Sequence, residues 1–300
     1  MNILVTGAWN CTKEQIDWIA GRGHQVTFLQ QEQDALPIPY EEVQGVICNG
    51  LFQYHPAEKF TNLRYIQLTS AGFDRVPMDF FLGKGISVQN ARDVYSIPMA
   101  EFAVCGVLQL YKQSRFFTEN QEKGCWKKRR GLMELYGKTV CVIGCGSVGT
   151  ECAKRFGAFG CRIFGVDANP GENGNYAYMA APEQLEEILP EADVIVLTLP
   201  LTEESRHLIN EKRLAHLKPG AVLVNISRGA VVDTQALLRW LQAERGAAVL
   251  DVFEEEPLSA ASPLWYMENV ILTPHNSFEG ERNGERLAAV IMSNLRNWMI

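Results

Sequence analysis

Residues 140–149, VCVIGCGSVG, decide the fold. An apolar run typical of a buried strand leads into three glycines spaced GxGxxG, and an amphipathic segment follows them. The glycine pattern is weak by itself, but the order strand, turn, helix is the context that it requires. Gly144 permits the tight turn, Gly146 allows a ligand to approach the backbone, and Gly149 lets the helix pack on the strand. We therefore predict a Rossmann-type turn whose free N–H groups bind a pyrophosphate.

Asp167 ends the next predicted strand, about 20 residues after the glycine turn, where dinucleotide-binding folds place an acidic residue. A carboxylate at this point accepts hydrogen bonds from ribose hydroxyls and repels a 2′-phosphate. Ala168 and Asn169 follow, so no arginine stands there to bind such a phosphate. The segment predicts NAD, rather than NADP, as the cofactor.

The composition indicates a globular protein with enough apolar residues for two cores. The chain has 300 residues, of which 47% are hydrophobic and 21% are charged, and its net charge is −7. An acidic chain is a poor nucleic-acid binder, and we interpret the basic run 127–130 as a solvated loop.

Two sequence features bear on the compartment and on metals. The N-terminus lacks the pattern of a secretory signal, and no apolar stretch approaches the roughly 20 residues of a membrane span. The eight cysteines show no zinc-binding spacing, so we expect reduced thiols, no metal and a cytoplasmic protein.

Short apolar runs alternate with amphipathic stretches along the whole chain, which predicts parallel sheets covered by helices. The first series of expected strands is 3–6, 25–29, 45–48, 65–68 and 85–89, and the second is 139–144, 162–166, 194–197, 221–226, 247–252 and 270–272. Helices are expected at 12–22, 98–122 and 280–298. The predicted fold class is α/β, with two doubly wound parallel-sheet domains.

Three later segments end predicted strands and carry reactive side chains. They are NISRG at 225–229, DVFEEEPL at 251–258 and LTPH at 272–275. In open α/β sheets, ligands bind outside the carboxyl ends of the strands. These segments are therefore expected to meet at one edge of the second sheet.

With the glycine turn, TLPLT at 198–202 and LKPGAVLVNISRGAVVD at 217–233, these segments resemble the D-isomer-specific 2-hydroxyacid dehydrogenase family. The resemblance covers most of the chain and is densest over residues 137–275. It implies NAD-dependent interconversion of a small D-2-hydroxy acid and its 2-keto acid.

The chemistry of that reaction explains three residue types. Charge develops on the C2 oxygen as hydride arrives, and histidine, with an ordinary pKa of about 6.5, suits the proton transfer there. His275 alone among five histidines has the Thr-Pro-His context, and the others are expected at the surface or in packing. Arg228 offers a planar, always charged fork for the substrate. The resemblance assigns the carboxylate that orients the imidazole to Glu256, whereas Glu254 and Glu255 are expected to be solvated.

The resemblance also implies further contacts. The cofactor residues are expected to be Gly144, Gly146, Ser147, Val148, Gly149, Asp167, Ile226, Ser227, Asp251, Asn276 and Ser277. The backbone of Ala71 and Gly72 is expected to bind the substrate carboxylate, and Trp265 either caps the substrate or packs. Asn276, Ser277 and Phe278 replace the small residues that are commonest after the family's histidine.

In the family, the dinucleotide domain is inserted into the substrate domain. The expected domains are therefore a flavodoxin-like substrate domain, 1–92 with 279–300, and a Rossmann NAD-binding domain, 93–278, joined by hinges. A homodimer through the cofactor domain is implied as well.

One alternative comes from another functional class. The same fold could serve an NAD-responsive, corepressor-like binding protein with little turnover, and a dehydrogenase with a quite different substrate is also open. Because no cluster of Arg or Lys stands out in the N-terminal half, a small unphosphorylated acid is slightly favoured.

Overall fold

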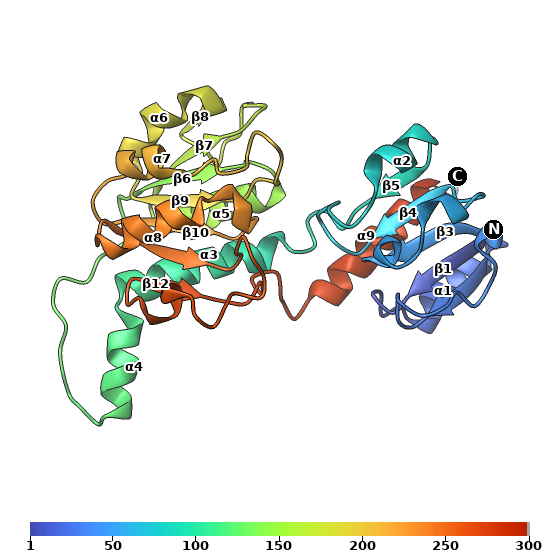
Figure 1. Cartoon of the computed structure of the whole chain (residues 1–300), viewed down its shortest axis with the longest axis horizontal. Coiled ribbons are helices and arrows are strands. Elements are labelled where there is room, and N and C mark those ends of the chain that lie inside the picture. The colour runs from blue at the N-terminus through green and yellow to red at the C-terminus, as the bar shows by residue number, and fades with distance from the viewer. Residues whose placement is uncertain (299–300) are drawn as a thin grey trace. The chain divides into compact units, whose positions relative to one another are not determined.

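The computed structural model describes residues 1–298, and the chain forms two compact units (Figure 1). The first contains Met1–Tyr95 and the C-terminal segment that begins at Gly280, and the second contains Ser96–Glu279. Within the described part of the chain, no helix combines the length and the apolar character that crossing a bilayer requires.

The first unit is built on a five-stranded parallel sheet in the order β2-β1-β3-β4-β5. Its strands are β1 (Asn2–Thr6), β2 (Gln25–Leu29), β3 (Val43–Cys48), β4 (Tyr65–Leu68) and β5 (Ser87–Gln89). This is the flavodoxin-like order, in which the chain reverses direction across the sheet beside β1. The predicted doubly wound fold is confirmed for this unit.

Both faces of this sheet are covered. On one face, α1 (Lys13–Ala20) and α9 (Asn283–Trp298) form a buried cluster with alternate residues of β1, such as Ile3. The ring of Trp298 stacks on that of Tyr65, with centroids 4.4 Å apart, so the last helix belongs to the first unit. On the other face, α2 (Met78–Gly83) contributes Phe81 to a second cluster.

The second unit has a seven-stranded parallel sheet in the order β12-β11-β10-β9-β6-β7-β8. Its strands are β6 (Thr139–Ile143), β7 (Arg162–Val166), β8 (Tyr178–Ala180), β9 (Val194–Leu197), β10 (Ala221–Asn225), β11 (Gly246–Leu250) and β12 (Val270–Leu272). The strand order reverses between β6 and β9, so ligands are expected at the carboxyl ends of these strands. The predicted Rossmann domain is confirmed, although β8 was not expected.

Successive apolar residues of these strands point to opposite faces of the sheet, and helices cover both faces. On one face, α3 (Ser96–Tyr111) and α5 (Ser147–Ala158) form a buried cluster with Val140 and Val142 of β6. On the other, α6 (Leu185–Ile188), α7 (Glu211–His216) and α8 (Thr234–Gln242) form a cluster with Cys141 and Ile143. Strands buried on both faces explain why the sequence shows continuous apolar runs there.

The single helix predicted over residues 98–122 is wrong. The structure has α3 and then α4 (Ser114–Glu122), separated by Gln113, whose φ of 54° is left-handed and incompatible with a continuous helix. Just before this break, the carbonyl of Tyr111 accepts a hydrogen bond from the N–H of Met133, 3.2 Å away. Figure 1 shows α4 and the segment after it extending away from the sheet, and we call residues 114–134 the arm.

Candidate active site

The glycine turn joins β6 to α5 and leaves no room for larger residues at two positions. Gly144 has a φ of 93°, and a Cβ there would lie 2.7 Å from the backbone nitrogen of Leu199, just after β9. A Cβ on Gly149 would lie 2.1 Å from the carbonyl oxygen of Gly144. Thr198 closes the turn from the neighbouring strand, because its hydroxyl contacts the carbonyl oxygen of Gly144 at 2.5 Å.

Gly146 differs because it faces open space. It is the N-cap of α5 and supplies no side-chain cap, and a Cβ there would meet nothing within 4 Å. The N–H groups of the first helical turn carry partial positive charge. The turn therefore fits a dinucleotide pyrophosphate, which would approach the backbone at Gly146, with Ser147 exposed and Val148 half-buried beside it.

Asp167 follows β7 and already binds the turn. Its Oδ2 accepts a hydrogen bond from the N–H of Cys145 at 2.7 Å, and its Oδ1 accepts one from the N–H of Asn169 at 2.9 Å. A carboxylate has about four acceptor positions, so two hydrogen bonds leave capacity for ribose hydroxyls. The sequence did not indicate that Asp167 also holds the glycine turn.

The loops after β11 and β12 bring a histidine and a glutamate into contact. Nδ1 of His275 lies 2.8 Å from Oε2 of Glu256, and the two side chains are 43% and 37% exposed. The other carboxylate oxygen of Glu256 accepts a hydrogen bond from the N–H of Phe253 at 2.9 Å. The loop after β11 thus orients the Glu256 carboxylate towards His275, and both side chains are open to solvent.

Asp251 fixes the backbone of the His275 loop. It is fully buried, and its carboxylate accepts hydrogen bonds from the Thr273 hydroxyl at 2.6 Å and from the N–H groups of Asn276 and Ser277 at 2.7 and 2.9 Å. Its carbonyl accepts one from the N–H of His275 at 2.7 Å. These bonds hold His275 at a φ of 53°, which is unfavourable for a residue other than glycine.

Arg228 follows β10 and is half-buried. Its Nη1 donates a hydrogen bond to the carbonyl of Ser227 at 2.8 Å, and its own carbonyl accepts one from the side-chain amide of Asn225 at 3.0 Å. The next residue, Gly229, packs directly on the loop that leads to Glu256, because a Cβ there would lie 1.9 Å from the carbonyl carbon of Phe253. The loops of Arg228 and Glu256 are therefore in contact.

The other predicted cofactor residues differ in accessibility. Ile226, Ser227 and Ser277 are buried, and the hydroxyl of Ser227 donates to the side chain of Asn225. Asn276 is exposed. Burial of these side chains leaves mainly backbone atoms for contact with a ligand, so their cofactor roles stay predictions.

The predicted substrate residues lie in the first unit, in the loop after β4. The hydroxyl of Ser70 donates to the carbonyl of Gly72 at 2.9 Å, and the side chain of Asn90 donates to that of Ala71 at 2.6 Å. With both carbonyls engaged inside the loop, its N–H groups are the polar atoms suited to an anion. In the second unit, Trp265 is 47% exposed, and its indole donates to the carbonyl of Ser259.

Two residues for which no catalytic role was expected, His207 and Glu254, form a second histidine–glutamate pair. Nε2 of His207 lies 2.6 Å from Oε1 of Glu254, whose Oε2 accepts a hydrogen bond from the N–H of Thr234 at 2.9 Å. Glu254 is exposed, as expected, but its carboxylate is also held by these two contacts. His207 and Glu254 are far apart in sequence, so no local pattern could have indicated the contact.

An α/β fold with a pyrophosphate turn and a histidine–carboxylate pair at one sheet edge defines a class, the dinucleotide-dependent oxidoreductases. Residues 104–277 match the family model of the D-isomer specific 2-hydroxyacid dehydrogenase NAD binding domain. The chain belongs to this family of NAD-dependent dehydrogenases, as the sequence analysis predicted.

Relatives and solved structures agree with this assignment. A glyoxylate reductase of Korarchaeum cryptofilum is 33% identical over 79% of this chain and 74% of its own length. A D-3-phosphoglycerate dehydrogenase of Methanocaldococcus jannaschii is 35% identical over 80% of this chain, which spans only 46% of that longer protein.

Two structures extend the likeness to both units. A D-lactate dehydrogenase of Aquifex aeolicus, complexed with NAD and lactic acid, has a TM-score of 0.78 at 26% identity and covers 99% of this chain and 96% of its own. A family member of Xanthobacter autotrophicus Py2 in complex with NADPH has a TM-score of 0.79 at 28% identity, with 98% and 94% covered. Cofactor-bound homologues thus contain either dinucleotide.

Proposed function

We propose that this protein interconverts a small D-2-hydroxy acid and its 2-keto acid, with His275 as the acid and base. The observation that carries the proposal is the 2.8 Å contact between His275 and Glu256 at the carboxyl edge of the sheet that holds the glycine turn. A bound nicotinamide supplies the hydride for keto-acid reduction or accepts it in the reverse direction.

The chain's own residues then move the proton and hold the substrate. Glu256 engages Nδ1 of His275, which leaves Nε2 to donate a proton to the C2 oxygen or to remove one from the hydroxyl. Arg228 binds the substrate carboxylate and polarises the C2 oxygen through its planar fork. The N–H groups of Ala71 and Gly72 bind the same carboxylate.

We assign the remaining roles as follows. Residues 1–92 with 279–300 bind substrate and 93–278 bind the cofactor, with hinges near residues 92 and 278 that let the units close and exclude water. Asp167 favours NAD over NADP, because its carboxylate repels a 2′-phosphate.

The substrate that fits best is a small, unphosphorylated acid. The ring of Phe278 lies edge to face with the imidazole of His275, with centroids 6.3 Å apart. A phenyl ring at this point occupies space beside the proton donor that a smaller residue would leave to the substrate. Glyoxylate, hydroxypyruvate and pyruvate are therefore the first candidates.

The test is a turnover assay with the purified protein, NADH and a panel of short, long and phosphorylated 2-keto acids. We expect turnover of at least one short acid. His275→Ala should lower kcat/KM by about 10²- to 10⁴-fold, the usual contribution of general acid–base catalysis, while NADH still binds. Glu256→Gln should act in the same direction, and Glu255→Gln is its matched control.

Binding of NADH without turnover of any panel member would contradict the proposal. That result would favour the alternative function, an NAD-responsive, corepressor-like binding protein. Full activity of His275→Ala would reject the assigned acid and base while leaving the dehydrogenase class intact.

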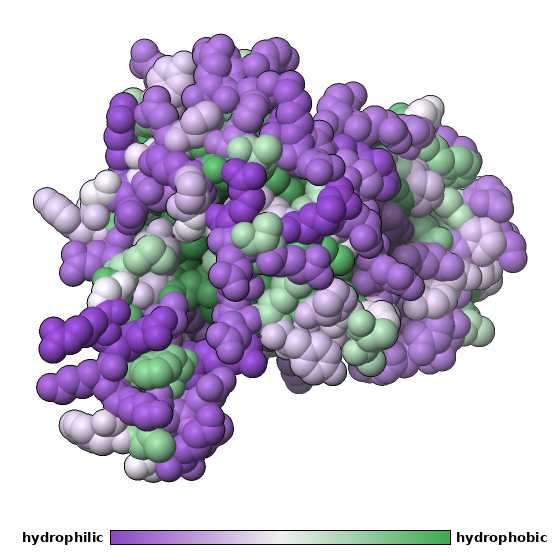
Figure 2. All heavy atoms as spheres, turned by 60° about the vertical axis from the view of Figure 1, so that its left-hand side comes forward, coloured by the Kyte–Doolittle hydropathy of each residue, from purple (hydrophilic) through white to green (hydrophobic). Residues whose placement is uncertain are grey.

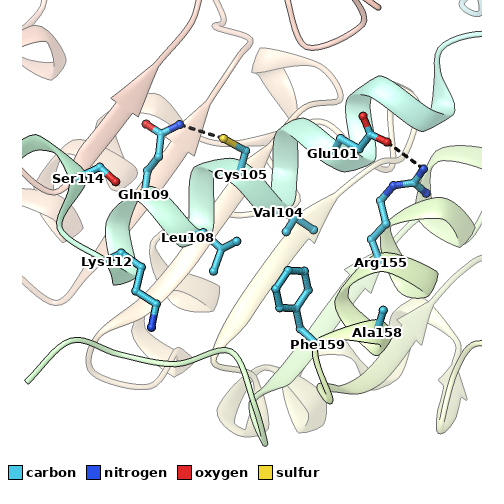
Figure 3. A pocket seen from close by; sticks show the side chains of 10 residues that line it. All are labelled: Glu101, Val104, Cys105, Leu108, Gln109, Lys112, Ser114, Arg155, Ala158 and Phe159. Atoms are coloured by element: carbon cyan, nitrogen blue, oxygen red, sulfur yellow. Dashed lines mark hydrogen bonds and ion pairs between the residues drawn. The ribbon is translucent and has the colours of Figure 1, made fainter.

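We further propose that the protein is a homodimer through its second unit. A groove of about 510 Å³ lies between α3 and α5, where Phe159, 44% exposed, faces Val104 and Leu108 (Figure 3). The arm presents Trp126, 95% exposed, next to the basic run 127–130, and Figure 2 shows hydrophobic residues among hydrophilic ones on this projection. A second copy fits, because the chain as a whole carries a charge of −7, opposite in sign to the run.

Light scattering tests the dimer. Leu108→Glu places a charge in the groove and should convert a dimer of 33.6 kDa subunits to monomers. Leu82→Glu, at a residue 59% exposed in the first unit, is the control and should stay dimeric. A monomeric wild-type protein would contradict the proposal.

Because all eight cysteines are free thiols, we also place the protein in the cytoplasm.

A further inference from the structure

We propose that Glu254 is a positioning residue, whose carboxylate joins the loop that carries Arg228 to the loop that carries Glu256. The inference rests on the proposed function of those two residues. It assigns a role in substrate binding to a side chain that does not itself need to touch substrate.

The contacts of Glu254 join three strand-end loops. Its Oε1 lies 2.6 Å from Nε2 of His207, in the loop after β9, and its Oε2 accepts the N–H of Thr234 at 2.9 Å. Thr234 is the first residue of α8 and directly follows the loop, residues 226–233, that carries Arg228. One carboxylate thus connects the loops that follow β9, β10 and β11.

The backbone reinforces this connection. A Cβ on Gly229 would lie 1.9 Å from the carbonyl carbon of Phe253 and 2.4 Å from the nitrogen of Glu254, so the two loops touch with no space between them. The N–H of His207 also donates to the carbonyl of Ala230 at 2.8 Å. A shift of the Glu254 backbone must therefore displace the residue next to Arg228.

The same turn sets the position of Glu256. The N–H of Phe253 donates to Oε1 of Glu256 at 2.9 Å, and Oε2 of Glu256 contacts His275. Glu254 lies inside this short turn, so its anchoring restricts the carboxylate that orients the imidazole.

The backbone conformation of His207 indicates that the network is under constraint. His207 has a φ of 50°, in the left-handed region that residues other than glycine disfavour. Such a conformation persists only where surrounding interactions hold it, and it is enriched at functional sites. The bonds of His207 to Glu254 and Ala230 are those interactions.

Electrostatics favours a charged Glu254. Its side chain is 30% exposed, and partial burial acts to raise the pKa of the carboxyl. Hydrogen bonds from Thr234 and His207 outweigh this effect, so the pKa of Glu254 lies below its usual value. Hydrogen bonds to a charged acceptor are stronger than neutral ones, which suits an anchoring role.

Kinetics of matched variants test the proposal. In Glu254→Gln and His207→Ala the anchored loops lose a charge-assisted bond, and we expect the KM for the best 2-keto acid to rise about tenfold. The dissociation constant of NADH, followed by fluorescence, should change less than twofold. His207→Gln keeps a donor and should restore most of the affinity, and Glu255→Gln, with the same change of charge, should behave as wild type.

A merely structural role gives a different pattern. It would lower the fraction of active enzyme, and hence the apparent kcat, while the KM stayed constant, so the KM and not the melting temperature distinguishes the two roles. The double variant His207→Ala/Glu254→Gln should be no worse than either single variant, because both remove one interaction. Equal KM values for wild type, Glu254→Gln and His207→Ala would overturn the proposal.

A crystal structure of Glu254→Gln separates this inference from the proposed function. We expect displacement of residues 228–230 or loss of the His275–Glu256 contact, neither of which should occur in Glu255→Gln. This result needs no turnover, so it stands even if no 2-keto acid is reduced. Unchanged loops would overturn the inference while leaving His275 as the proposed acid and base. Should Glu254→Gln fail to fold, His207→Ala provides the same comparison.

Discussion

The three glycines of the turn are constrained by different neighbours. Gly144 and Gly149 lie against the backbone of Leu199 and of Gly144 itself, whereas Gly146 faces open space at the start of α5. The fold therefore requires glycine at the first two positions, and we propose that ligand binding requires it at the third. This distinction makes cofactor binding testable apart from stability.

Gly146→Ala should fold normally and bind NADH at least about tenfold more weakly, because its methyl group occupies the space that a pyrophosphate needs. Titration of NADH fluorescence measures the binding and thermal unfolding measures the fold. Gly171→Ala, where a Cβ also meets nothing within 4 Å, is the control and should bind as wild type. Unchanged affinity in Gly146→Ala would exclude the turn as the pyrophosphate site.

The lowered pKa of Glu254 predicts a pH dependence of stability. A carboxyl whose pKa is lower in the folded state than in the unfolded state stabilises the fold above the unfolded value, and this contribution disappears as the pH falls through the folded value. Glu254→Gln should therefore have a smaller free energy of unfolding than wild type at pH 7. The difference should shrink as the pH falls through the acidic range in which carboxyl groups take up protons, as urea titrations at neutral and acidic pH would show. A difference that grows with acid would contradict the assigned direction.

Neighbouring glutamates show the limit of sequence reasoning for single residues. Glu254, Glu255 and Glu256 look alike in the sequence, and only the resemblance distinguished Glu256. The partners that distinguish Glu254, which are His207 and the N–H of Thr234, come from loops that meet it only in the folded sheet. Roles that depend on such distant contacts could not be predicted.

At the level of elements, most strands could be predicted because short apolar runs mark them in the sequence. Apolar runs bounded by glycine, proline or aspartate gave β2, β4, β7, β9 and β12 with the bounds that the structure has. The edge strand β8 was missed, since an apolar run of only three residues, Tyr178–Ala180, is too short to indicate a strand. The break between α3 and α4 was also missed, because nothing local marks Gln113 as left-handed.

Two helix glycines test how closely these elements pack. A Cβ on Gly106 of α3 would lie 2.5 Å from a methyl group of Val249 in β11, whereas one on Gly157 of α5 would only touch Ile163 at 4.0 Å. Gly106→Ala should lower the free energy of unfolding by about 1–3 kcal/mol through overpacking. Gly157→Ala should raise it by about 0.5–1 kcal/mol through reduced chain entropy. Chemical denaturation measures both, and stabilisation by Gly106→Ala would contradict the close approach of α3 to the sheet.

For the whole molecule, the alternating strand and helix pattern indicated two doubly wound units, because parallel strands need crossover helices. The assignment of the last helix to the first unit came from the family resemblance. The structure divides the chain at Tyr95 and Ser96 and again at Glu279 and Gly280. The hinges that we propose near residues 92 and 278 concern motion of the units, which these boundaries do not test.

We propose that hydride reaches C2 of a small 2-keto acid beside His275. The most direct measurement uses NADH that carries deuterium at both C4 positions, with hydroxypyruvate or pyruvate as acceptor, and analyses the product by mass spectrometry and chiral chromatography. We predict a D-2-hydroxy acid with one deuterium at C2, formed by wild type and nearly absent with His275→Ala. A product of L configuration, a product without deuterium, or equal yields from both proteins would contradict the account.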